Sequence, residues 1–369
     1  MMIKMYDSTT IDQIVWPDTE EGGLAKRHLQ ILMKEGPETF IHNARTNLLI
    51  LSVDNLIIPI TVNDAEYANC YLLSSYFIAA NLKEKIEKGS LWFKLCFKPL
   101  LPFFSLFLKW VKINKAVIIN NWLLSTNPYP EITESQIEKI ISFLKEKFPN
   151  HYFMFRSINN YANSTVFDSL RRAQFKLIPC RHVYLYDPKR QISANFLRKQ
   201  KKDTNRIAQK KYTVETVHFL TDKEIERLLQ LYINVYVDKY TQYSPLYTEK
   251  FLKHGLHSQT LKLKLLKKGE EIYGVTGFLE KNDYLLVPFF GYDTTVPQDE
   301  GLYRMLSAVI MEEIEISNRI SHQGSGAGQF KKWRGCIEEL EYVGIYDRHL
   351  SFKRRAFWSL SQMFSGWFL

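Results

Sequence analysis

The order of apolar segments between residues 116 and 186 constrains the fold of this chain more than any other feature. Three short apolar runs are typical of buried strands: residues 116–124, 152–158 and 177–186. Apolar residues at helical spacing separate these runs, first between Ile137 and Phe148 and again after Ser164. Thr133 and Gln136 form a capping box in front of the first of these helices. Strands that alternate with helices in this way predict an α/β half-domain.

The rest of the chain supplies further strands. Residues 48–53 and 56–62 are typical of two strands joined by a turn at Asp54-Asn55. Three later runs predict a hairpin and a third strand: residues 261–266, 272–279 and 284–292. A capping box at Thr221 and Glu224 precedes one helix, and an amphipathic helix follows the third strand. With 369 residues, of which 46% are hydrophobic, the chain is long enough for two domains of ordinary size.

Charge and cysteine content narrow the setting in which the chain works. The formal net charge of +10 and the isoelectric point near 9.1 predict an anionic partner, whether a phosphorylated cofactor, an acidic lipid surface or a nucleic acid. The four cysteines lie far apart, which argues against a zinc site or a disulfide framework and fits a reducing cytoplasm. The first ten residues lack the apolar core of a signal peptide. We therefore expect a cytoplasmic protein.

A glycine-rich stretch at residues 323–335 bears most directly on function. Its small residues lie in front of a basic and aromatic cluster. A bare backbone beside positive charge suits an anionic group, either a phosphate or the oxygen of a thioester that gains charge during acyl transfer. The stretch has neither the Gly-Lys-Ser/Thr ending of a P-loop nor the Gly-x-Gly-x-x-Gly of a dinucleotide fold. A surface turn beside solvated lysines is the alternative interpretation.

Two segments are unusually apolar or aromatic. Residues 91–111 are interrupted by lysines and two prolines, and their uninterrupted part is shorter than the roughly 20 residues of a spanning helix. This segment has three interpretations: a buried part of the core, a lid over an apolar substrate, or an interfacial patch. Residues 353–369 combine a basic start with many aromatic side chains. They fit either a terminal helix docked on the protein or a helix in a membrane interface.

The order of motifs in the second half resembles the GNAT-like acyltransferases. A hairpin with a Lys-Lys-Gly turn leads to a strand that ends Phe-Gly-Tyr-Asp, then to a long helix and a glycine loop with Phe330-Lys331. Residues 196–212 carry seven lysines and arginines against one aspartate, which by itself predicts a solvated helix between domains. This run resembles a basic stretch common in the branch that includes the Fem-type peptidoglycan aminoacyltransferases and their acyl-CoA-dependent relatives. The similarity covers residues 196–355, and residues 116–186 resemble a degenerate copy of the same fold.

The resemblance implies an α/β chain with two tandem GNAT-like domains, each a mixed, largely antiparallel sheet flanked by helices. Residues 1–187 would form the degenerate N-terminal domain, residues 188–352 the C-terminal acyltransferase domain, and residues 353–369 a basic and aromatic tail. GNAT enzymes bind the pyrophosphate of CoA on a Gln/Arg-x-x-Gly-x-Gly/Ala loop at a helix start. Gln298 and Gly301 match this pattern, but Tyr303 replaces the second small residue and two acids precede Gly301.

Acyl transfer requires alignment of two substrates, a path for a proton, and hydrogen-bond donors at the developing oxyanion. Tyr292, Asp293 and His322 are the candidates for the proton path, His322 because its pKa suits neutral pH. The resemblance implies that the donor contacts Phe290, Gly291, Gln298, Gly301, Gly326, Gly328, Lys331, Lys332 and Arg334. We expect no metal site, because the sequence has neither His-Glu-x-x-His nor a carboxylate cluster with metal-ligand spacing.

The resemblance implies an acyltransferase that moves an acyl group from acyl-CoA, or from an acyl carrier protein, to an amine-bearing acceptor. The apolar segments favour a lipidic or cell-envelope acceptor and a peripheral contact with the inner face of the membrane. Acyl-CoA is then a co-substrate, and no tightly bound cofactor is expected. One alternative is a Fem-type transferase that uses aminoacyl-tRNA, which the charge favours and the absence of a long hairpin insertion in the second half disfavours. The other is a catalytically degenerate binding or scaffold protein, which the irregular Gln298–Tyr303 loop favours.

Overall fold

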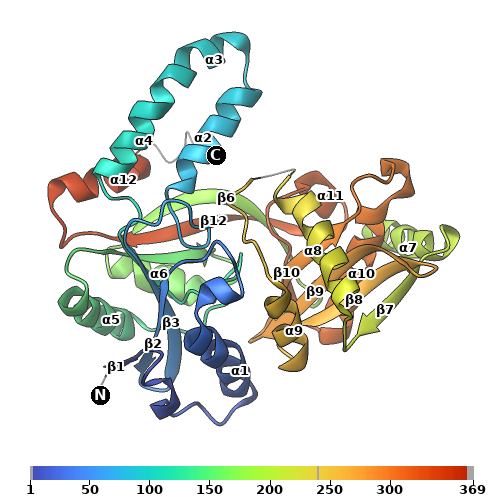
Figure 1. Ribbon diagram of the computed structural model, residues 1–369, viewed down its shortest axis with the longest axis horizontal. Helices are drawn as coiled ribbons and strands as arrows, with labels where there is room; N and C mark the ends of the chain where they lie inside the picture. The colour runs from blue at the N-terminus through green and yellow to red at the C-terminus, as the bar shows by residue number, and fades with distance from the viewer. Residues whose placement is uncertain (1–2, 239–240, 364–369) are drawn as a thin grey trace.

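One mixed sheet runs through the whole molecule in the computed structural model, which describes residues 3–238 and 241–363 (Figure 1). The strand order is β1-β2-β3-β4-β5-β12-β6-β11-β10-β9-β8-β7. The strands are β1 (Ile3–Tyr6), β2 (Asn47–Val53), β3 (Leu56–Asn63), β4 (Ala116–Ile119), β5 (Tyr152–Ile158), β6 (Lys176–Tyr186), β7 (Thr213–Val217), β8 (Lys262–Lys268), β9 (Glu271–Lys281), β10 (Tyr284–Tyr292), β11 (Ile320–His322) and β12 (Ile337–Tyr346).

Helices cover both faces of this sheet. The α-helices are α1 (Glu20–Glu35), α2 (Phe77–Lys88), α3 (Leu91–Phe97), α4 (Leu101–Trp110), α5 (Glu134–Lys147), α6 (Ser164–Arg172), α7 (Ala194–Gln209), α8 (Asp222–Tyr236), α9 (Glu249–His257), α10 (Leu302–Ser317), α11 (Gly328–Lys332) and α12 (Phe352–Met363). Short 3-10 helices are η1 (Ile11–Gln13), η2 (Pro37–Thr39), η3 (Lys98–Leu100) and η4 (Gln298–Glu300).

Apolar cores lie on both faces of the sheet. On one face, a continuous core lies between the sheet and α1, α8 and α9, so it joins both halves of the molecule. On the other face, α5 and α6 cover the first half and α10 covers the second. Residues alternate between the two sides along each strand, as Ile50 and Leu51 of β2 illustrate.

The strands from β1 to β6 in this order form the first half of the sheet, and those from β11 to β7 form the second. Each half contains one parallel pair of strands among antiparallel neighbours. The pairs are β4 with β5 and β10 with β11. The last strand of the chain, β12, lies between β5 and β6 and pairs antiparallel with both. The first half is therefore completed by a strand from the end of the sequence. The α/β class and the mixed, largely antiparallel sheet confirm the predicted fold.

Local signals located most of these elements. The strands at Tyr152–Ile158 and Tyr284–Tyr292 have the predicted bounds, and the capping boxes of Thr133 and Thr221 are both formed. Two details differ. β4 ends at Ile119, because Asn120 and Leu123 adopt left-handed backbone angles with φ of 57° and 58°. The N-cap of α6 is Asn163, and Ser164 is the first residue of the helix itself.

Most of the apolar segment 91–111 lies outside the core, and within it only Leu108 and Val111, near its end, are buried. Its helices α3 and α4, joined by η3, form a hairpin with α2 that projects from the sheet (Figure 1). Leu91, Trp92 and Phe103 are 71%, 79% and 70% exposed. The interpretation as a buried part of the core is therefore wrong. Within the described chain, Leu91–Trp110 is a helix long and apolar enough to cross a membrane by length and composition.

The described part of the tail docks on the protein. Phe357 and Trp358 of α12 are buried, and the ring of Trp358 packs edge-on against Tyr152 of β5 at 5.4 Å between centroids. Asp347, which precedes α12, pairs with Lys176 at 2.6 Å. The predicted tail also includes residues 364–369, which lie outside the described residues.

Candidate functional site

The short strand β11 pairs along its whole length with the beginning of β10. Their register pairs Leu286 with His322 and goes no further. β10 continues to Tyr292, whereas the chain after His322 turns toward β6, where the Gln323 N–H donates to the carbonyl of Tyr184 at 2.9 Å. Beyond Leu286, β10 therefore has no strand partner on this side among the described residues, and we call this gap in the strand pairing the opening.

Helix α10 begins at this opening without a capping side chain. Gly301 is its N-cap and adopts a left-handed conformation with φ of 80°. Arg206 of α7 lies across the helix start, where its Nη1 donates to the carbonyl of Asp299 at 3.1 Å and its Cδ lies against Gly301. The buried Nε–H of Arg206 has no hydrogen-bond partner in the described chain. Uncapped amides at the positive end of a helix, beside an unpaired guanidinium N–H, favour an anion.

Glu300, one of the two acids in front of α10, has its charge matched by nearby lysines. Glu300 pairs with Lys210 of α7 at 2.9 Å and with Lys268 at 3.2 Å. These hydrogen bonds lower the pKa of Glu300 to about 2. The carboxylate is thus matched by two lysines from different elements, which the sequence pattern around Gln298 could not indicate.

Lys331 holds the glycine loop from within. Its side chain is buried, and its ammonium donates to the carbonyls of Gln323 and Gly324. Burial lowers the pKa of Lys331 to about 8. A buried lysine that satisfies loop carbonyls fixes the backbone of that loop.

Arg334 joins α7 to the end of α11. Its Nε and Nη2 donate to Asp203 at 2.7 and 2.6 Å, and the guanidinium lies 3.5 Å from the centre of the Phe330 ring. Lys332 reaches the surface and pairs with Glu338 at 3.0 Å. Lys331 and Arg334 therefore stabilise the fold in this conformation. The positive charge nearest the start of α10 comes from α7.

A row of aromatic rings lies along the same opening. Tyr303, in the first turn of α10, contacts Phe290 at 5.9 Å, Tyr292 at 6.2 Å and Phe330 at 5.0 Å between ring centroids. Phe290 and Tyr292 belong to β10, and Phe330 belongs to α11. The tyrosine that replaces the expected small residue thus bridges the two sides of the opening.

The predicted glycines have different surroundings. A Cβ on Gly291 would lie 2.6 Å from the backbone of Leu231, so this glycine allows α8 to approach β10 closely. A Cβ on Gly328 would lie 2.0 Å from the hydroxyl of Tyr184. Gly326 is exposed in the loop before α11. Gly291 and Gly328 are thus explained by packing.

Asp293 is held in an ion pair. Its Oδ2 accepts from Arg227 Nη2 at 2.7 Å, and its Oδ1 accepts from the backbone and hydroxyl of Thr295. Burial alone would raise the pKa of Asp293, but the hydrogen bonds from Thr295 and Arg227 outweigh it and leave the pKa below its usual value. A carboxylate with a lowered pKa is a weak base.

His322 lies in a buried network between the two halves. Its Nε2 donates to Glu341 of β12 at 3.2 Å, and its Nδ1 accepts from the Gly324 N–H at 3.2 Å and contacts the Thr126 hydroxyl at 3.1 Å. Glu341 also accepts from Arg181 of β6 at 2.7 Å. Both ring nitrogens of His322 are therefore engaged, which fits a structural link between β11 and β12.

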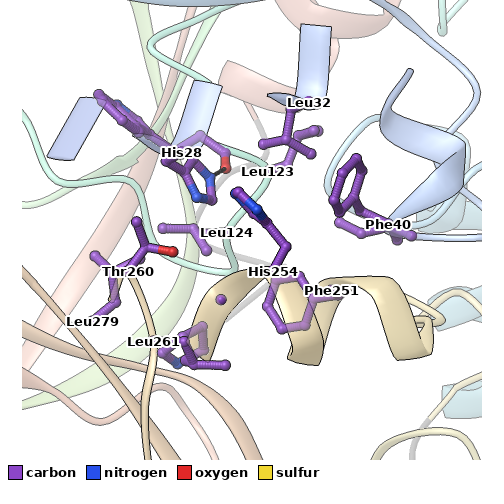
Figure 2. A pocket seen from close by; sticks show the side chains of 14 residues that line it. His28, Leu32, Phe40, Leu123, Leu124, Phe251, His254, Thr260, Leu261 and Leu279 are labelled. Atoms are coloured by element: carbon purple, nitrogen blue, oxygen red, sulfur yellow. Dashed lines mark hydrogen bonds between the residues drawn. The ribbon is translucent and has the colours of Figure 1, made fainter. Parts of the chain in front are cut away.

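A mostly apolar pocket lies on the face of the sheet that α1 and α9 cover. Figure 2 shows the imidazoles of His28 and His254 close to each other at this pocket. Their Nε2 atoms donate to the carbonyls of Trp122 and Arg27 at 3.2 and 3.1 Å. Burial lowers the pKa of His28 to about 4, which keeps this imidazole neutral. Pro288, in the bulge of β10, also lines the pocket, so the pocket reaches the strand that borders the opening.

The predicted residues separate into groups. Phe290, Tyr292, Gly301 and the Tyr303 side chain meet at the opening, whereas His322 and Asp293 belong to separate networks. Gln298 is exposed in η4. Sequence reasoning missed Arg206, although the basic run containing it was the available signal. No group of three or more potential metal ligands occurs among the described residues.

The arrangement of strands identifies the fold. Each half has antiparallel strands around one parallel pair, a helix connects the strands of each pair, and the second pair separates to leave an opening. The chain has a tandem GNAT-like fold.

Solved structures of other proteins align with most of this chain. A conserved protein of unknown function from Bacteroides thetaiotaomicron VPI-5482 aligns with 93% of this chain and 99% of its own, with a TM-score of 0.51 and 11% identity. FemX aligns with 96% of this chain and 97% of its own, with a TM-score of 0.49 and 8% identity. A tandem GNAT protein from the clavulanic acid biosynthesis pathway covers 94% of this chain and 98% of its own, with a TM-score of 0.41 and 7% identity. No family model and no curated protein sequence matches the chain.

Proposed function

We propose that this tandem GNAT-like protein is an acyltransferase that binds acyl-CoA with its pyrophosphate at the start of α10. The observation that carries this proposal is the uncapped helix start at Gly301 with the unpaired Nε–H of Arg206 beside it. A pyrophosphate would accept from the first-turn amides and from this guanidinium. The pairing of Glu300 with Lys210 and Lys268 offsets the repulsion that the Glu300 carboxylate would otherwise exert on a phosphate.

The opening between β10 and β11 offers a place for the rest of the donor. An extended amide-bearing arm, such as pantetheine, can pair with the edge of a strand that lacks a neighbour. The edge of β10 beyond Leu286 is of this kind. Tyr303 and Phe330 bridge the opening, so we propose that these rings turn aside when the donor enters.

Transfer would follow by direct attack of a neutral amine on the thioester carbon. The new C–N bond forms as the C–S bond breaks, the amine loses a proton, and the CoA thiolate gains one. Tyr292, half-buried in the aromatic row, is our candidate for the acid that protonates the thiolate. The pocket that includes His28 and Pro288 is our candidate acceptor site, because it approaches β10 from the other face of the sheet.

The experiment is a comparison of CoA binding by two arginine variants of α7. We expect Arg206→Ala to weaken CoA binding about 10- to 100-fold, the effect of losing charge-assisted hydrogen bonds to a phosphate. Arg198→Ala is the matched control, because Arg198 is exposed on the same helix and, within the described chain, its side chain bonds only to Asn195, at 3.2 Å. Isothermal titration calorimetry with CoA and acetyl-CoA measures the affinity of each variant. Equal affinities of the two variants would contradict the proposal.

A transferase that uses aminoacyl-tRNA is the second candidate. The exposed cations Arg198, Lys201 and Lys202 on the outer side of α7 favour it, since such a row of charge suits a phosphate backbone. In this case bulk tRNA would bind with a steep dependence on salt, and Arg198→Ala would weaken it. Failure to bind either CoA or tRNA would favour the scaffold function.

A further inference from the structure

The hairpin of α2, α3, η3 and α4 is the largest feature that the proposed function does not use. It is inserted between β3 and β4 and projects from the sheet (Figure 1). Its second arm exposes large apolar side chains along its whole length: Leu91, Trp92, Phe93, Leu95, Phe97, Leu100, Phe103, Leu106 and Trp110. A contiguous apolar surface of this kind marks a contact with a membrane or with another protein.

The charge of the hairpin indicates which of these it contacts. From Lys88 to Pro130 the sequence contains six lysines and no acidic residue. Lys98, Lys109 and Lys112 are exposed beside the apolar surface. Apolar side chains flanked by lysines suit the interface of a bilayer that contains anionic lipids, because the apolar groups enter the acyl boundary and the ammonium groups reach the phosphates.

The base of the hairpin adds to this surface. Phe107 of α4 contacts Phe357 of α12, and Lys353 lies 4.1 Å from the centre of the Trp110 ring. Phe352 and Met363 of α12 are 80% and 68% exposed. α12 thus supports the hairpin through its buried rings and presents further apolar and basic groups beside it.

The first arm of the hairpin argues against a full span. α2 carries Lys83, Glu84, Lys85, Glu87 and Lys88. Because α2 packs along α4, a crossing of the bilayer by Leu91–Trp110 would take these charges into the hydrocarbon region. Shallow insertion of the end of the hairpin avoids this cost.

We propose that the hairpin α2–α4 docks this protein peripherally on an anionic lipid bilayer by inserting its α3 end into the interface. The inference is independent of the proposed function.

The test is co-sedimentation with vesicles of phosphatidylcholine, with and without phosphatidylglycerol. We expect binding to the anionic vesicles that falls at least about tenfold in the double variant Trp92→Ser, Leu95→Ser, since each exposed side chain loses its apolar transfer from water. Phe219→Ser is the matched control, because Phe219 is 80% exposed on the second half, outside the hairpin. No binding to anionic vesicles, or equal binding by the double variant, would overturn the proposal.

A fluorescent label on the hairpin tests which part of the protein contacts the membrane. Cys96 is exposed on α3, so an environment-sensitive dye on it, in a Cys180→Ser background, should shift to the blue with anionic vesicles. Concentration-dependent dimerisation that the double variant abolishes, without any vesicle binding, would instead identify a second copy as the occupant and overturn the proposal. CoA binding measured on the same proteins separates this result from the proposed function, because we expect the double variant to bind CoA normally.

Discussion

At the scale of single residues, Glu341 is a buried charge at the boundary between the two halves of the molecule. Its carboxylate is buried between Arg181 at 2.7 Å and His322 at 3.2 Å. Burial alone would raise the pKa of Glu341, but the attraction of Arg181 and the hydrogen bond from His322 outweigh it and lower the pKa to about 2. Because the three residues come from β6, β11 and β12, this network fastens the two halves together.

The lowered pKa makes a prediction about stability in acid. The folded pKa of Glu341 is below its ordinary value of 4.5, so its stabilisation is complete above pH 4.5 and is lost as the pH falls toward 2. The shift corresponds to about 3 kcal/mol. We expect Glu341→Gln to lower the free energy of unfolding at pH 7 by about 3 kcal/mol and to flatten its decline below pH 4.5.

Urea denaturation at a series of pH values measures both effects. Glu226→Gln is the control, because Glu226 is exposed on α8. If Glu341→Gln retained the acid dependence of the unaltered protein, another carboxylate would have to cause it.

At the scale of elements, the predictions from the sequence were correct for features that depend on residues close together in the chain. The capping boxes at Thr133 and Thr221 and the strand at Tyr284–Tyr292 depend on side chains a few positions apart, and all three formed as predicted. The orientation of Lys331 and Arg334 could not be predicted in this way. Their partners are loop carbonyls and Asp203, an acid more than a hundred positions earlier in the chain.

The exposure of the apolar hairpin also could not be predicted from the sequence. Composition alone could not distinguish a core segment from an exposed one, because the same leucines and phenylalanines serve in both. Only the position of the hairpin outside the sheet decides that Trp92 and Phe103 are exposed. Likewise, the sequence showed the basic run of α7, but not that Arg206 would face the start of α10.

The close packing of α8 on β10 predicts that an alanine at Gly291 destabilises the protein more than an alanine at Gly324, which lies outside this contact. A Cβ on Gly291 would lie 2.6 to 2.7 Å from backbone atoms of Leu231 and Tyr232, so the helix must shift. We expect Gly291→Ala to cost about 3 kcal/mol of stability. Gly324→Ala meets no atom within 4 Å and is strained only by its φ of 68°, so it should cost about 1 kcal/mol. Thermal and urea unfolding compare the two; similar costs would show that α8 adjusts easily.

At the scale of the whole molecule, the two halves are interleaved. β12, from the end of the chain, separates β5 from β6 in the sheet of the first half. The core on the α1 side contains Leu29 of α1 together with Leu228 of α8. The halves therefore share both a sheet and a core, although their sequences are consecutive.

This interleaving predicts that residues 1–187 do not fold alone. Without β12, the edges of β5 and β6 would each expose unpaired N–H and carbonyl groups, and the α1 face would lose its partner from the second half. We expect this fragment to aggregate or to lack a cooperative thermal transition, and co-expression with residues 188–369 to recover a soluble complex with native circular dichroism. Co-expression with residues 188–336, which lack β12, is the control and should fail. A cooperative transition of the isolated fragment would mean that β5 and β6 can pair directly, and that β12 inserts into a sheet already able to form.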